Sequence, residues 1–408
     1  MSPNSYDFVI AGAGIVGLAT AQNLLKRNPK AKVLVIDKED HPAAHQTGHN
    51  SGVIHSGIYY KPDSLKAKNC LEGYHLLLAY CDEHKIPYEL CGKIIVATTK
   101  EEIPALEKLF ERGIANGLEG IKYITQEEIK EREPFAAGIK GIWVPQTGIV
   151  DYKDVARAYA AEIIKLGGNI TFNEKVVQLI DHEDEVAIKT DKKSYKAKKF
   201  INCAGLFSDK IAALQIPDLN VRIIPFRGEY YELIPEKRGM VKNLIYPVPD
   251  PAFPFLGVHF TRRVDGLIEA GPNAVFAFKR EGYKKSDFSF ADFYNAISWK
   301  GFRKVAIKYW KTGLGEFYRS YSKAAFTKAL QKLMPAIRAT DLIPSGSGVR
   351  AQACELNGGL LDDFHIIQQG ACIHVLNAPS PAATSSLSIG KKVASLAMGD
   401  DTALVETQ

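Results

Sequence analysis

Three glycines near the start of the chain, Gly12, Gly14 and Gly17, have the spacing of a phosphate-binding turn. An apolar run precedes them, an apolar helical pattern follows them, and Asp37 stands 20 positions after Gly17. In such a turn Gly12 permits the bend, Gly14 lets the backbone approach a pyrophosphate, and Gly17 lets the helix pack on the strand. The pattern predicts a dinucleotide site, and the alternative is a glycine-bearing turn without a ligand. The residues assigned to this site are Gly12, Gly14, Ile15, Val16, Gly17, Asp37 and Lys38.

Histidine and arginine supply the other chemistry that the sequence offers. His55 lies in the run GVIHSG and His259 in the run LGVHFT, and either side chain can take a proton from a substrate. Arg227 and Arg350 each carry a planar fork that matches a carboxylate. The alternative for each is a structural role, as a hydrogen-bonded histidine or a solvated arginine.

His45 and His49 stand four residues apart, a spacing that can bind zinc on a helix. Gly48 and the run Asn50–Gly52 argue against a helix there, so we expect no metal site. The segment is interpreted as a loop that contacts the cofactor.

Regular elements must position these residues. A strand over 6–11, a helix over 15–26 and a strand over 32–36 form a βαβ unit around the glycine turn. Between 221 and 271, short apolar runs separated by Pro and Gly are typical of an antiparallel sheet. Further helices are expected over 65–84, 103–116, 152–166, 288–333 and 385–398, and further strands over 92–98, 170–172, 175–180, 186–190 and 199–202.

The composition sets limits on the class of protein. At 408 residues the chain exceeds what one hydrophobic core usually supports, so we expect at least two domains. It has no apolar run of about 18 residues and no pattern of a secretion signal. The six cysteines form no CxxC pair, which favours free thiols in a reducing compartment. We therefore expect a cytoplasmic protein.

Segments far from the glycine turn resemble one family along nearly the whole chain. Residues 174–177 (EKVV) resemble its strand beside the adenine, and residues 202–205 (NCAG) with Asp209 resemble its second dinucleotide segment. Residues 346–350 (GSGVR) resemble its flavin-side element. The family is that of the FAD-dependent oxidoreductases related to D-amino-acid oxidase, glycine oxidase and glycerol-3-phosphate dehydrogenase. The resemblance implies FAD, in a Rossmann-like α/β domain interleaved with an α+β domain whose antiparallel sheet is flanked by helices.

Longer stretches narrow the resemblance. Residues 45–70, 91–98 and 377–390 are similar to the L-2-hydroxyglutarate dehydrogenase/oxidase family. This implies oxidation of L-2-hydroxyglutarate to 2-oxoglutarate by hydride transfer from C2 to flavin N5, with quinone or oxygen as the final acceptor. One alternative is a related FAD enzyme that oxidises an amino acid or glycerol 3-phosphate. Another is a non-catalytic flavin-binding protein.

The resemblance also assigns roles to the candidates. His259 is preferred as the base, because a substrate-domain histidine stands over the flavin in the similar amine-oxidising enzymes, and His55 is the alternative. Arg350 and then Arg227 are expected to hold the substrate carboxylates. Further substrate candidates are Tyr60, Lys61, Tyr246 and Thr261. Further cofactor candidates are His45, Thr47, Asn50, Ser51, Gly52, Val177, Ala204, Gly205, Gly348, Arg350, Ser380, Ala382, Ala383 and Thr384.

Residues 279–332 carry 13 Lys and Arg against 4 Asp and Glu, together with 13 aromatic residues. Trp299, Phe302, Ala306 and Tyr309 fit helical spacing. One hypothesis is a face that lies on an anionic membrane, on the inner side of the cell membrane, and gives access to quinone. The alternative is an amphipathic helical pair that covers the substrate sheet. No nucleic-acid binding is expected, because no recognition motif accompanies the charge.

Breaks in the pattern predict two discontinuous domains. The FAD-binding domain is assigned residues 1–80, 150–215 and 335–408. The substrate-binding domain is assigned residues 81–149 and 216–334, which include the basic aromatic segment.

Overall fold

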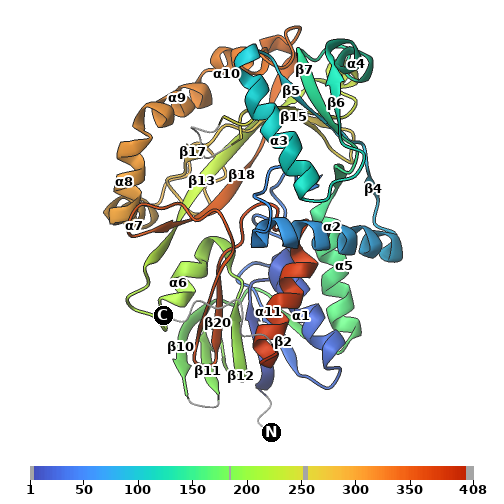
Figure 1. The fold of residues 1–408 in the computed structure, drawn as a ribbon. Helices are drawn as coiled ribbons and strands as arrows, with labels where there is room; N and C mark the ends of the chain where they lie inside the picture. Colours follow the sequence, from blue (N-terminus) through green and yellow to red (C-terminus); the bar gives the residue numbers. More distant parts are fainter. Residues whose placement is uncertain (1–3, 183–184, 251–255, 401–408) are drawn as a thin grey trace.

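The computed structural model describes residues 4–182, 185–250 and 256–400. Within these ranges two large β-sheets occupy opposite ends of the molecule, an eight-stranded one at the bottom of Figure 1 and a nine-stranded one at the top. A small three-stranded sheet accompanies them. It joins β3 (Val53–Ile54), β8 (Gly148–Val150) and β4 (Tyr88–Glu89).

The first sheet surrounds the strand that precedes the glycine turn. This strand, β1 (Ser5–Ala11), pairs in parallel with β2 (Val33–Ile36) and β12 (Ser194–Asn202). A central parallel strand is covered on both faces, which explains the unbroken apolar run that ends β1. The remaining strands of the sheet are β9 (Asn169–Thr171), β10 (Val176–Asp181), β11 (Val186–Thr190), β19 (His365–Gln369) and β20 (Cys372–Asn377).

Three helices form one hydrophobic core with the first sheet. The helix after the glycine turn, α1 (Ile15–Arg27), packs between α5 (Tyr152–Lys165) and α11 (Ser386–Met398). The long α2 (Leu65–His84) crosses over α11, and the short α6 (Ser208–Ala212) follows β12. The expected helix over 65–84 is confirmed. The expected start of α5 is confirmed too, because the side chain of Asp151 accepts a hydrogen bond from Lys153 N.

A long two-stranded ribbon forms the spine of the second sheet. In it β13 (Val221–Leu233) runs antiparallel to β18 (Leu342–Glu355). The other strands of the sheet are β5 (Lys93–Ala97), β6 (Lys122–Thr125), β7 (Lys140–Val144), β14 (Leu244–Pro247), β15 (His259–Arg262), β16 (Ile268–Gly271) and β17 (Val275–Phe276). Strands β14 and β5 pair in parallel, so the sheet is mixed rather than purely antiparallel as expected.

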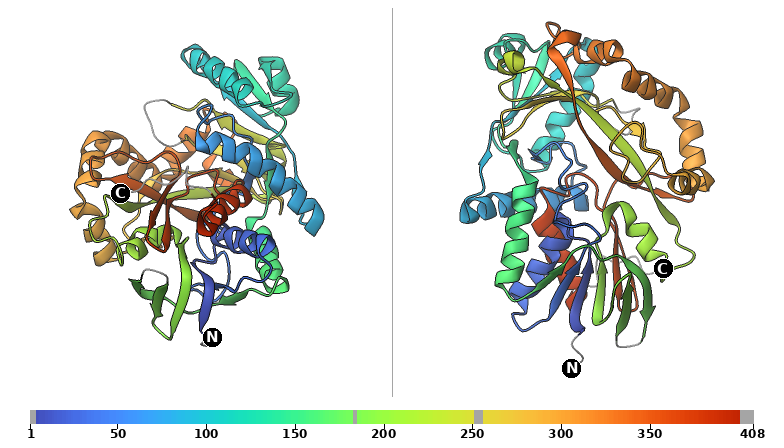
Figure 2. Two further views of the ribbon diagram at one scale, coloured as in Figure 1. Left: turned by 60° about the horizontal axis from the view of Figure 1, so that its bottom comes forward. Right: turned by 180° about the vertical axis from the view of Figure 1, so that it is seen from behind.

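Helices flank the second sheet on two sides. The first pair is α3 (Ile103–Ala115) and α4 (Gln126–Arg132). An arc of helices lies along the opposite, outer edge of the molecule (Figures 1 and 2). It consists of α7 (Phe290–Ser298), α8 (Lys300–Lys308), α9 (Trp310–Tyr321) and α10 (Lys323–Leu330). Within the described ranges, no helix is both long and apolar enough to cross a bilayer.

The fold class expected from the sequence is confirmed, with a parallel βαβ core in one layer and a second sheet flanked by helices in the other. One predicted boundary needs correction. Residues 342–355 were assigned to the cofactor domain, but as β18 they pair along β13 in the second sheet. The ribbon is held by strand pairing between segments more than 100 residues apart, which local patterns do not show.

Candidate active site

The glycine turn has the geometry that its spacing predicts. Gly12 has a φ of +111°, and a Cβ there would lie 2.4 Å from the carbonyl oxygen of Cys203. A Cβ on Gly17 would lie 2.0 Å from the carbonyl oxygen of Gly12. Gly14 differs, because its backbone is extended and a Cβ would make only an ordinary contact with Thr47 Oγ1, at 3.5 Å. Packing therefore requires glycine at positions 12 and 17, whereas the space beside Gly14 is open.

The start of α1 is suited to an anion. It has neither a side-chain cap nor an acidic residue in its first turn. Ile15 N donates to Thr47 Oγ1 at 3.0 Å, which ties the following loop to the helix. The carboxylate of Asp37 accepts hydrogen bonds from Ala13 N at 2.6 Å and from Glu39 N at 2.9 Å. Asp37, which the sequence assigned to the dinucleotide site, thus also fixes the turn itself.

Segments from both sheets close around this turn. A Cβ on Gly348, in β18, would lie 2.4 Å from the carbonyl oxygen of His49. Gly205, with a φ of +52°, packs against the side chain of Gln46. The ribbon of the second sheet and the end of β12 therefore both contact the loop over 45–52, as the predicted returns to the cofactor require.

The turn before α11 joins the same region. The hydroxyl of Thr384 accepts a hydrogen bond from His55 N at 3.1 Å and lies 2.8 Å from the hydroxyl of Tyr152. The buried Ser385 hydroxyl has no hydrogen-bond partner among the described residues. α11, like α1, begins without a side-chain cap. Two uncapped helix starts, the open space at Gly14 and an unpartnered buried hydroxyl fit a large dinucleotide such as FAD.

Four charged side chains form a cluster beside this region. Glu39, His45 and Glu281 place ligand-type atoms within 4.8 Å of one another. Lys38 Nζ, however, forms ion pairs with both carboxylates, including one to Glu281 at 2.6 Å. Burial raises the pKa of Glu281, but hydrogen bonds from His45 and Lys38 lower it to about 2. We assign the cluster to ion pairing that joins the first sheet to the segment before α7. The ammonium of Lys38 already neutralises both carboxylates, and its charge would repel a metal cation.

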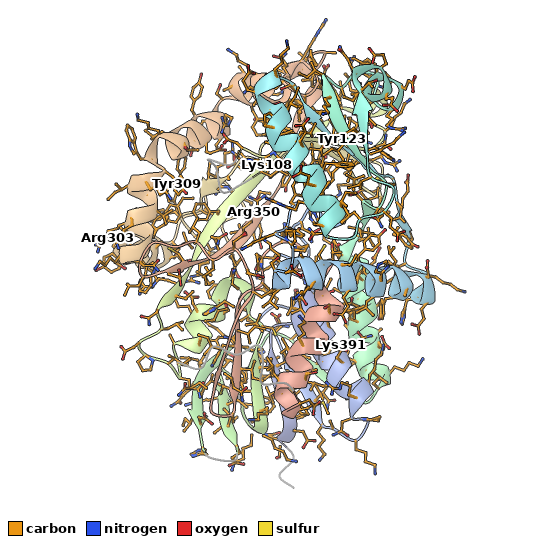
Figure 3. All side chains as sticks on the ribbon, viewed as in Figure 1. Lys108, Tyr123, Arg303, Tyr309, Arg350 and Lys391 are labelled. Carbon is orange, nitrogen blue, oxygen red and sulfur yellow. The ribbon has the colours of Figure 1, made fainter. Side chains whose placement is uncertain are left out.

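His259 has the geometry of a neutral base. Its side chain is 5% exposed on β15, and its Nδ1 lies 2.8 Å from the carbonyl oxygen of Gly257. A carbonyl only accepts, so Nδ1 carries the proton and the lone pair is on Nε2. Burial lowers the pKa of His259 to about 3, and the charges of Arg350 and Lys93 act in the same direction. Arg350 lies on β18, near the centre of the molecule (Figure 3).

Lys93 was not predicted from the sequence, and it lies beside this histidine. It begins β5, is 1% exposed, and has its Nζ 4.6 Å from the ring centre of Tyr59 and 4.9 Å from that of Tyr246. Tyr246 in turn stacks on His259 with ring centroids 3.9 Å apart. Burial lowers the pKa of Lys93 to about 7. The only sequence signal is a charged residue at the start of the apolar run KIIVA.

His55 reaches the same cluster from the other side. Its Nε2 lies 3.4 Å from Ser380 Oγ, and burial followed by the charge of Lys93 lowers its pKa to about 3. The hydroxyl of Tyr59 is buried with no hydrogen-bond partner among the described residues, and Thr261 on β15 is 1% exposed. The structure brings His55, His259, Tyr246 and Thr261 into one region, and their roles stay predictions.

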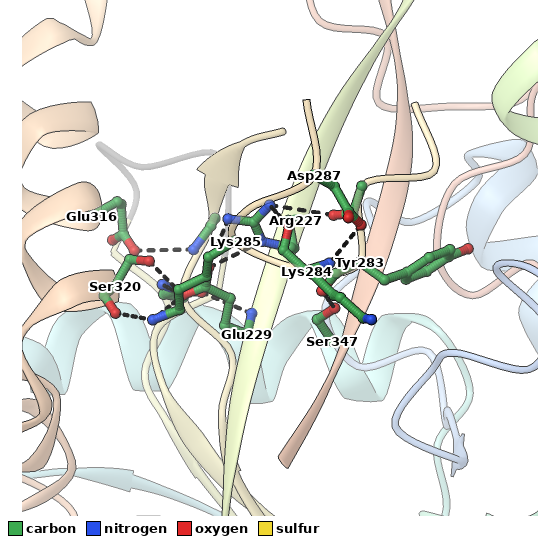
Figure 4. Close-up of polar contacts among 12 residues, drawn as sticks. Arg227, Glu229, Tyr283, Lys284, Lys285, Asp287, Glu316, Ser320 and Ser347 are labelled. Carbon is green, nitrogen blue, oxygen red and sulfur yellow. Dashed lines mark hydrogen bonds and ion pairs between the residues drawn. The ribbon is translucent and has the colours of Figure 1, made fainter. Parts of the chain in front are cut away.

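Arg227 does not belong to this cluster, which corrects its assignment to the substrate. Its Nε and Nη2 donate to Glu229 at 3.0 and 2.9 Å, and its Nη1 donates to the carbonyl oxygens of Gly282 and Lys284 (Figure 4). Neighbouring residues on a strand point to opposite faces. Phe226 is paired with Arg350, and Arg227 with the residue before it in β18, Val349, so the two arginines face opposite ways.

The remaining predicted residues have mixed placements. Lys61 is exposed in the turn before α2, and its assignment to the substrate stays a prediction. Tyr60 is buried under Lys66, whose Nζ lies 5.3 Å from the ring centre. Asn50 uses its side chain within its own loop, where it donates to the carbonyl of Thr47 and accepts from Gly52 N.

Five further predicted cofactor contacts remain predictions. Val177 lies at a bulge of β10 and is 41% exposed. Ser51 and Ala204 lie in the loops that close on the glycine turn. Ala382 and Ala383 are partly buried against the core of the first sheet, in the turn before α11.

Comparisons with known proteins agree with this geometry. The chain matches the model of the FAD dependent oxidoreductase family over residues 7–396. It is 58% identical over 394 residues to L-2-hydroxyglutarate dehydrogenase from Indibacter alkaliphilus, covering 96% of this chain and 99% of that protein. It is 46% identical over 391 residues to the enzyme of that name from Escherichia coli K12, covering 96% and 92%. The mitochondrial enzyme of that name from Homo sapiens is 46% identical over 411 residues, covering 96% and 89%.

Solved structures share the fold. L-alpha-glycerophosphate oxidase from Mycoplasma pneumoniae, with FAD bound, has a TM-score of 0.78 at 22% identity and covers 99% of both chains. Glycine oxidase from Geobacillus kaustophilus has a TM-score of 0.74 at 17% identity, covering 98% of this chain and 96% of that one. The family resemblance and the FAD cofactor expected from the sequence are confirmed. The chain belongs to the FAD-dependent oxidoreductase family, and its full-length relatives group it with the L-2-hydroxyglutarate dehydrogenases.

Proposed function

We propose that this enzyme oxidises L-2-hydroxyglutarate to 2-oxoglutarate. The observation that carries the proposal is the arrangement of His259, whose Nδ1 is fixed by a backbone carbonyl and whose Nε2 is free to accept a proton beside two cations. The names of relatives at 46–58% identity supply the substrate.

The chain's own residues divide the chemistry as follows. Arg350 holds a substrate carboxylate through its planar fork and so places the C2 hydroxyl group beside His259. His259 takes the hydroxyl proton at Nε2 while the C2–H bond breaks and the C2–O single bond becomes a double bond. FAD, when bound, supplies the two-electron oxidant that accepts the hydride. The buried ring of Tyr246 and the buried hydroxyl end of Tyr59 limit the access of water here, which strengthens each charge interaction.

The cofactor would be held by the glycine turn, the loop over 45–52 and the turn before α11. The start of α1 and the glycine turn bind the pyrophosphate, and Asp37 orders that turn. The turn before α11 would offer backbone N–H groups to the flavin, and such donors would stabilise negative charge on its ring. The residues that support this assignment are Gly12, Gly14, Thr47, Gly205, Gly348, Thr384 and Ser385.

Turnover with a panel of substrates tests the reaction. The purified protein with an artificial electron acceptor should form 2-oxoglutarate from L-2-hydroxyglutarate. The D-enantiomer, L-malate, glycine and glycerol 3-phosphate should react far more slowly. Faster turnover of glycine or glycerol 3-phosphate would instead support an amino-acid or glycerol-phosphate oxidase.

A second part of the proposal concerns the outer face of α7–α9, which we call the basic aromatic face. Apolar side chains on it are strongly exposed, including Phe290 at 73%, Ile307 at 75%, Leu314 at 61% and Tyr321 at 71%. Leu314 and Tyr321 lie seven residues apart in α9, so they share one side of that helix, and Ile307 lies near the end of α8. Exposed basic residues accompany them, namely Lys300, Arg303, Lys304, Lys308 and Lys311.

The same helices bury their other side. Trp299, Phe302 and Val305 are each less than 10% exposed and form a core against β13 and β18, with Trp299 Nε1 donating to the carbonyl oxygen of Cys354. The inner side therefore covers the sheet, as one hypothesis expected. That leaves the outer apolar row without a partner among the described residues. Apolar side chains ringed by cations suit the surface of an anionic bilayer, from which a quinone could take the electrons.

Flotation with vesicles of phosphatidylglycerol and phosphatidylcholine tests this surface. The wild-type protein should float at low salt, and the double variant Ile307→Glu/Leu314→Glu should not. Ile164→Glu, at an apolar position on α5 that is 56% exposed, is the control and should float. Absence of wild-type binding at low salt would leave oxygen as the favoured acceptor.

A further inference from the structure

The ammonium group of Lys93 is buried, and none of the described residues gives it an acidic partner. Its side chain is 1% exposed, at the start of β5 in the middle of the second sheet. Within the described part of the chain, Lys93 Nζ has no carboxylate or carbonyl oxygen at bonding distance, and its contacts are the ring faces of Tyr59 and Tyr246. Lysine is almost never buried unless it is paired, because the charge loses its hydration. Two ring faces replace only part of that hydration.

Other cations of the same sheet show the usual arrangement. Lys140, on β7, also lies over a tyrosine ring, with its Nζ 4.4 Å from the ring centre of Tyr123. Lys140 is partly exposed and forms an ion pair with Glu107 at 2.7 Å. Lys93 therefore lacks the carboxylate that its counterpart has, although it lies much deeper.

The position of Lys93 links it to the reacting centre. Tyr246 lies between the two, with the Lys93 ammonium near its ring and His259 stacked on it. The charges of Lys93 and Arg350 both lower the pKa of His259, so the two cations lie close to the same imidazole. The charge of Lys93 also lowers the pKa of His55, so its ammonium acts on both histidines.

We propose that Lys93 binds one of the two carboxylates of the substrate while Arg350 binds the other, and that this second cation makes the enzyme selective for 2-hydroxy diacids. The inference rests on the proposed oxidation of L-2-hydroxyglutarate. A carboxylate of the substrate would pair with the ammonium of Lys93, which has no acidic partner among the described residues. A monoacid leaves the buried ammonium unpaired, and a site built to pair with a polar group rejects analogues that lack it.

The test compares a diacid with a matched monoacid. L-2-hydroxypentanoate has the carbon chain of L-2-hydroxyglutarate, with a methyl group in place of the distal carboxylate. The variants are Lys93→Met, which keeps the length of the side chain but not its charge, and Lys93→Arg, which keeps the charge. Lys140→Met is the control, because it removes a lysine from a tyrosine ring of the same sheet. The readout is kcat/KM for each substrate, together with the melting temperature.

Lys93→Met should lower kcat/KM for the diacid by about 30-fold or more and change that for the monoacid by no more than about threefold. Lys93→Arg should retain part of the preference for the diacid, and Lys140→Met should retain it all. The melting temperature of Lys93→Met should not fall, because the variant removes an unpaired buried charge.

Equal losses on both substrates, or an unchanged preference for the diacid, would overturn the role of Lys93. If Lys93→Met does not fold, Lys93→Gln is compared with Lys93→Arg by the same ratio. A wild-type enzyme that oxidises neither compound would instead refute the proposed function, so the two failures are distinguishable.

Discussion

The imidazole of His259 and the phenol ring of Tyr246 stack with their centroids 3.9 Å apart and their planes 27° from parallel. Together with the hydrogen bond from Nδ1 to the carbonyl of Gly257, this stacking fixes both the orientation and the tautomer of the imidazole. The free nitrogen is therefore Nε2, before any substrate binds.

Replacing His259 should remove the proton acceptor without disturbing the cofactor. In His259→Asn the amide nitrogen can still donate to the carbonyl of Gly257, so the strand should keep its shape. We expect kcat for L-2-hydroxyglutarate to fall by about 10²- to 10⁴-fold, while the flavin content stays at the wild-type level. Stopped-flow reduction and the absorbance of the bound flavin measure the two quantities. A kcat within a few-fold of wild type would show that His259 is not the base.

The activity should decline toward alkaline pH. Burial lowers the pKa of Lys93 to about 7, so the ammonium is charged below that pH and neutral above it. Because a carboxylate binds the charged form, kcat/KM for the diacid should fall about tenfold per pH unit above pH 7. The groups that face Lys93 are Tyr59, Tyr246, Cys70, Cys91, His55 and His259.

None of these neighbours should produce the same decline. Burial raises the pKa of both tyrosines and both cysteines, and lowers that of both histidines to about 3. In Lys93→Arg the decline should therefore move to higher pH, because arginine stays charged. A profile that is flat from about pH 6 to 9 in the wild type would contradict the assignment.

The two arginines of the β13–β18 ribbon should respond to substitution in opposite ways. Arg227 is held by Glu229 at 4% side-chain exposure, and breaking a buried pair leaves an uncompensated charge. Arg227→Met should therefore destabilise the protein by about 3–5 kcal/mol while kcat/KM of the folded fraction changes little. Arg350→Met should instead lower kcat/KM at least tenfold. Chemical denaturation and steady-state kinetics distinguish the two variants. A raised KM with normal stability in Arg227→Met would instead show that Arg227 is a substrate ligand.

A side chain on Gly14 should block the cofactor but not the fold. Its backbone is extended and a Cβ there meets nothing closer than 3.5 Å, so Gly14→Val should fold. The branched side chain would fill the space that the pyrophosphate needs. We expect a colourless, folded protein, checked by circular dichroism and flavin release. Gly239→Ala, at a position with open space around it, is the control and should remain yellow. A yellow Gly14→Val protein would place the phosphates elsewhere.

Local sequence patterns predicted most of the elements around the glycine turn. The turn at Gly12–Gly17 and the helices expected over 65–84 and from residue 152 each depend on neighbours in sequence, and each is found as expected. The site on the second sheet was harder to predict. Lys93, Tyr59 and Tyr246 meet only because β5 pairs in parallel with β14, and no local pattern shows that pairing. Arg227 was assigned to the substrate from its residue type alone, since its partner Glu229 and the carbonyls that hold it appear only in the folded chain.

Anaerobic titration of the purified protein with L-2-hydroxyglutarate tests the central claim most directly. The account predicts that the visible absorbance of the oxidised flavin is lost in proportion to the substrate added, that one 2-oxoglutarate forms per flavin reduced, and that the D-enantiomer leaves the spectrum unchanged. A flavin spectrum that L-2-hydroxyglutarate does not bleach, or a protein that carries no flavin, would contradict it.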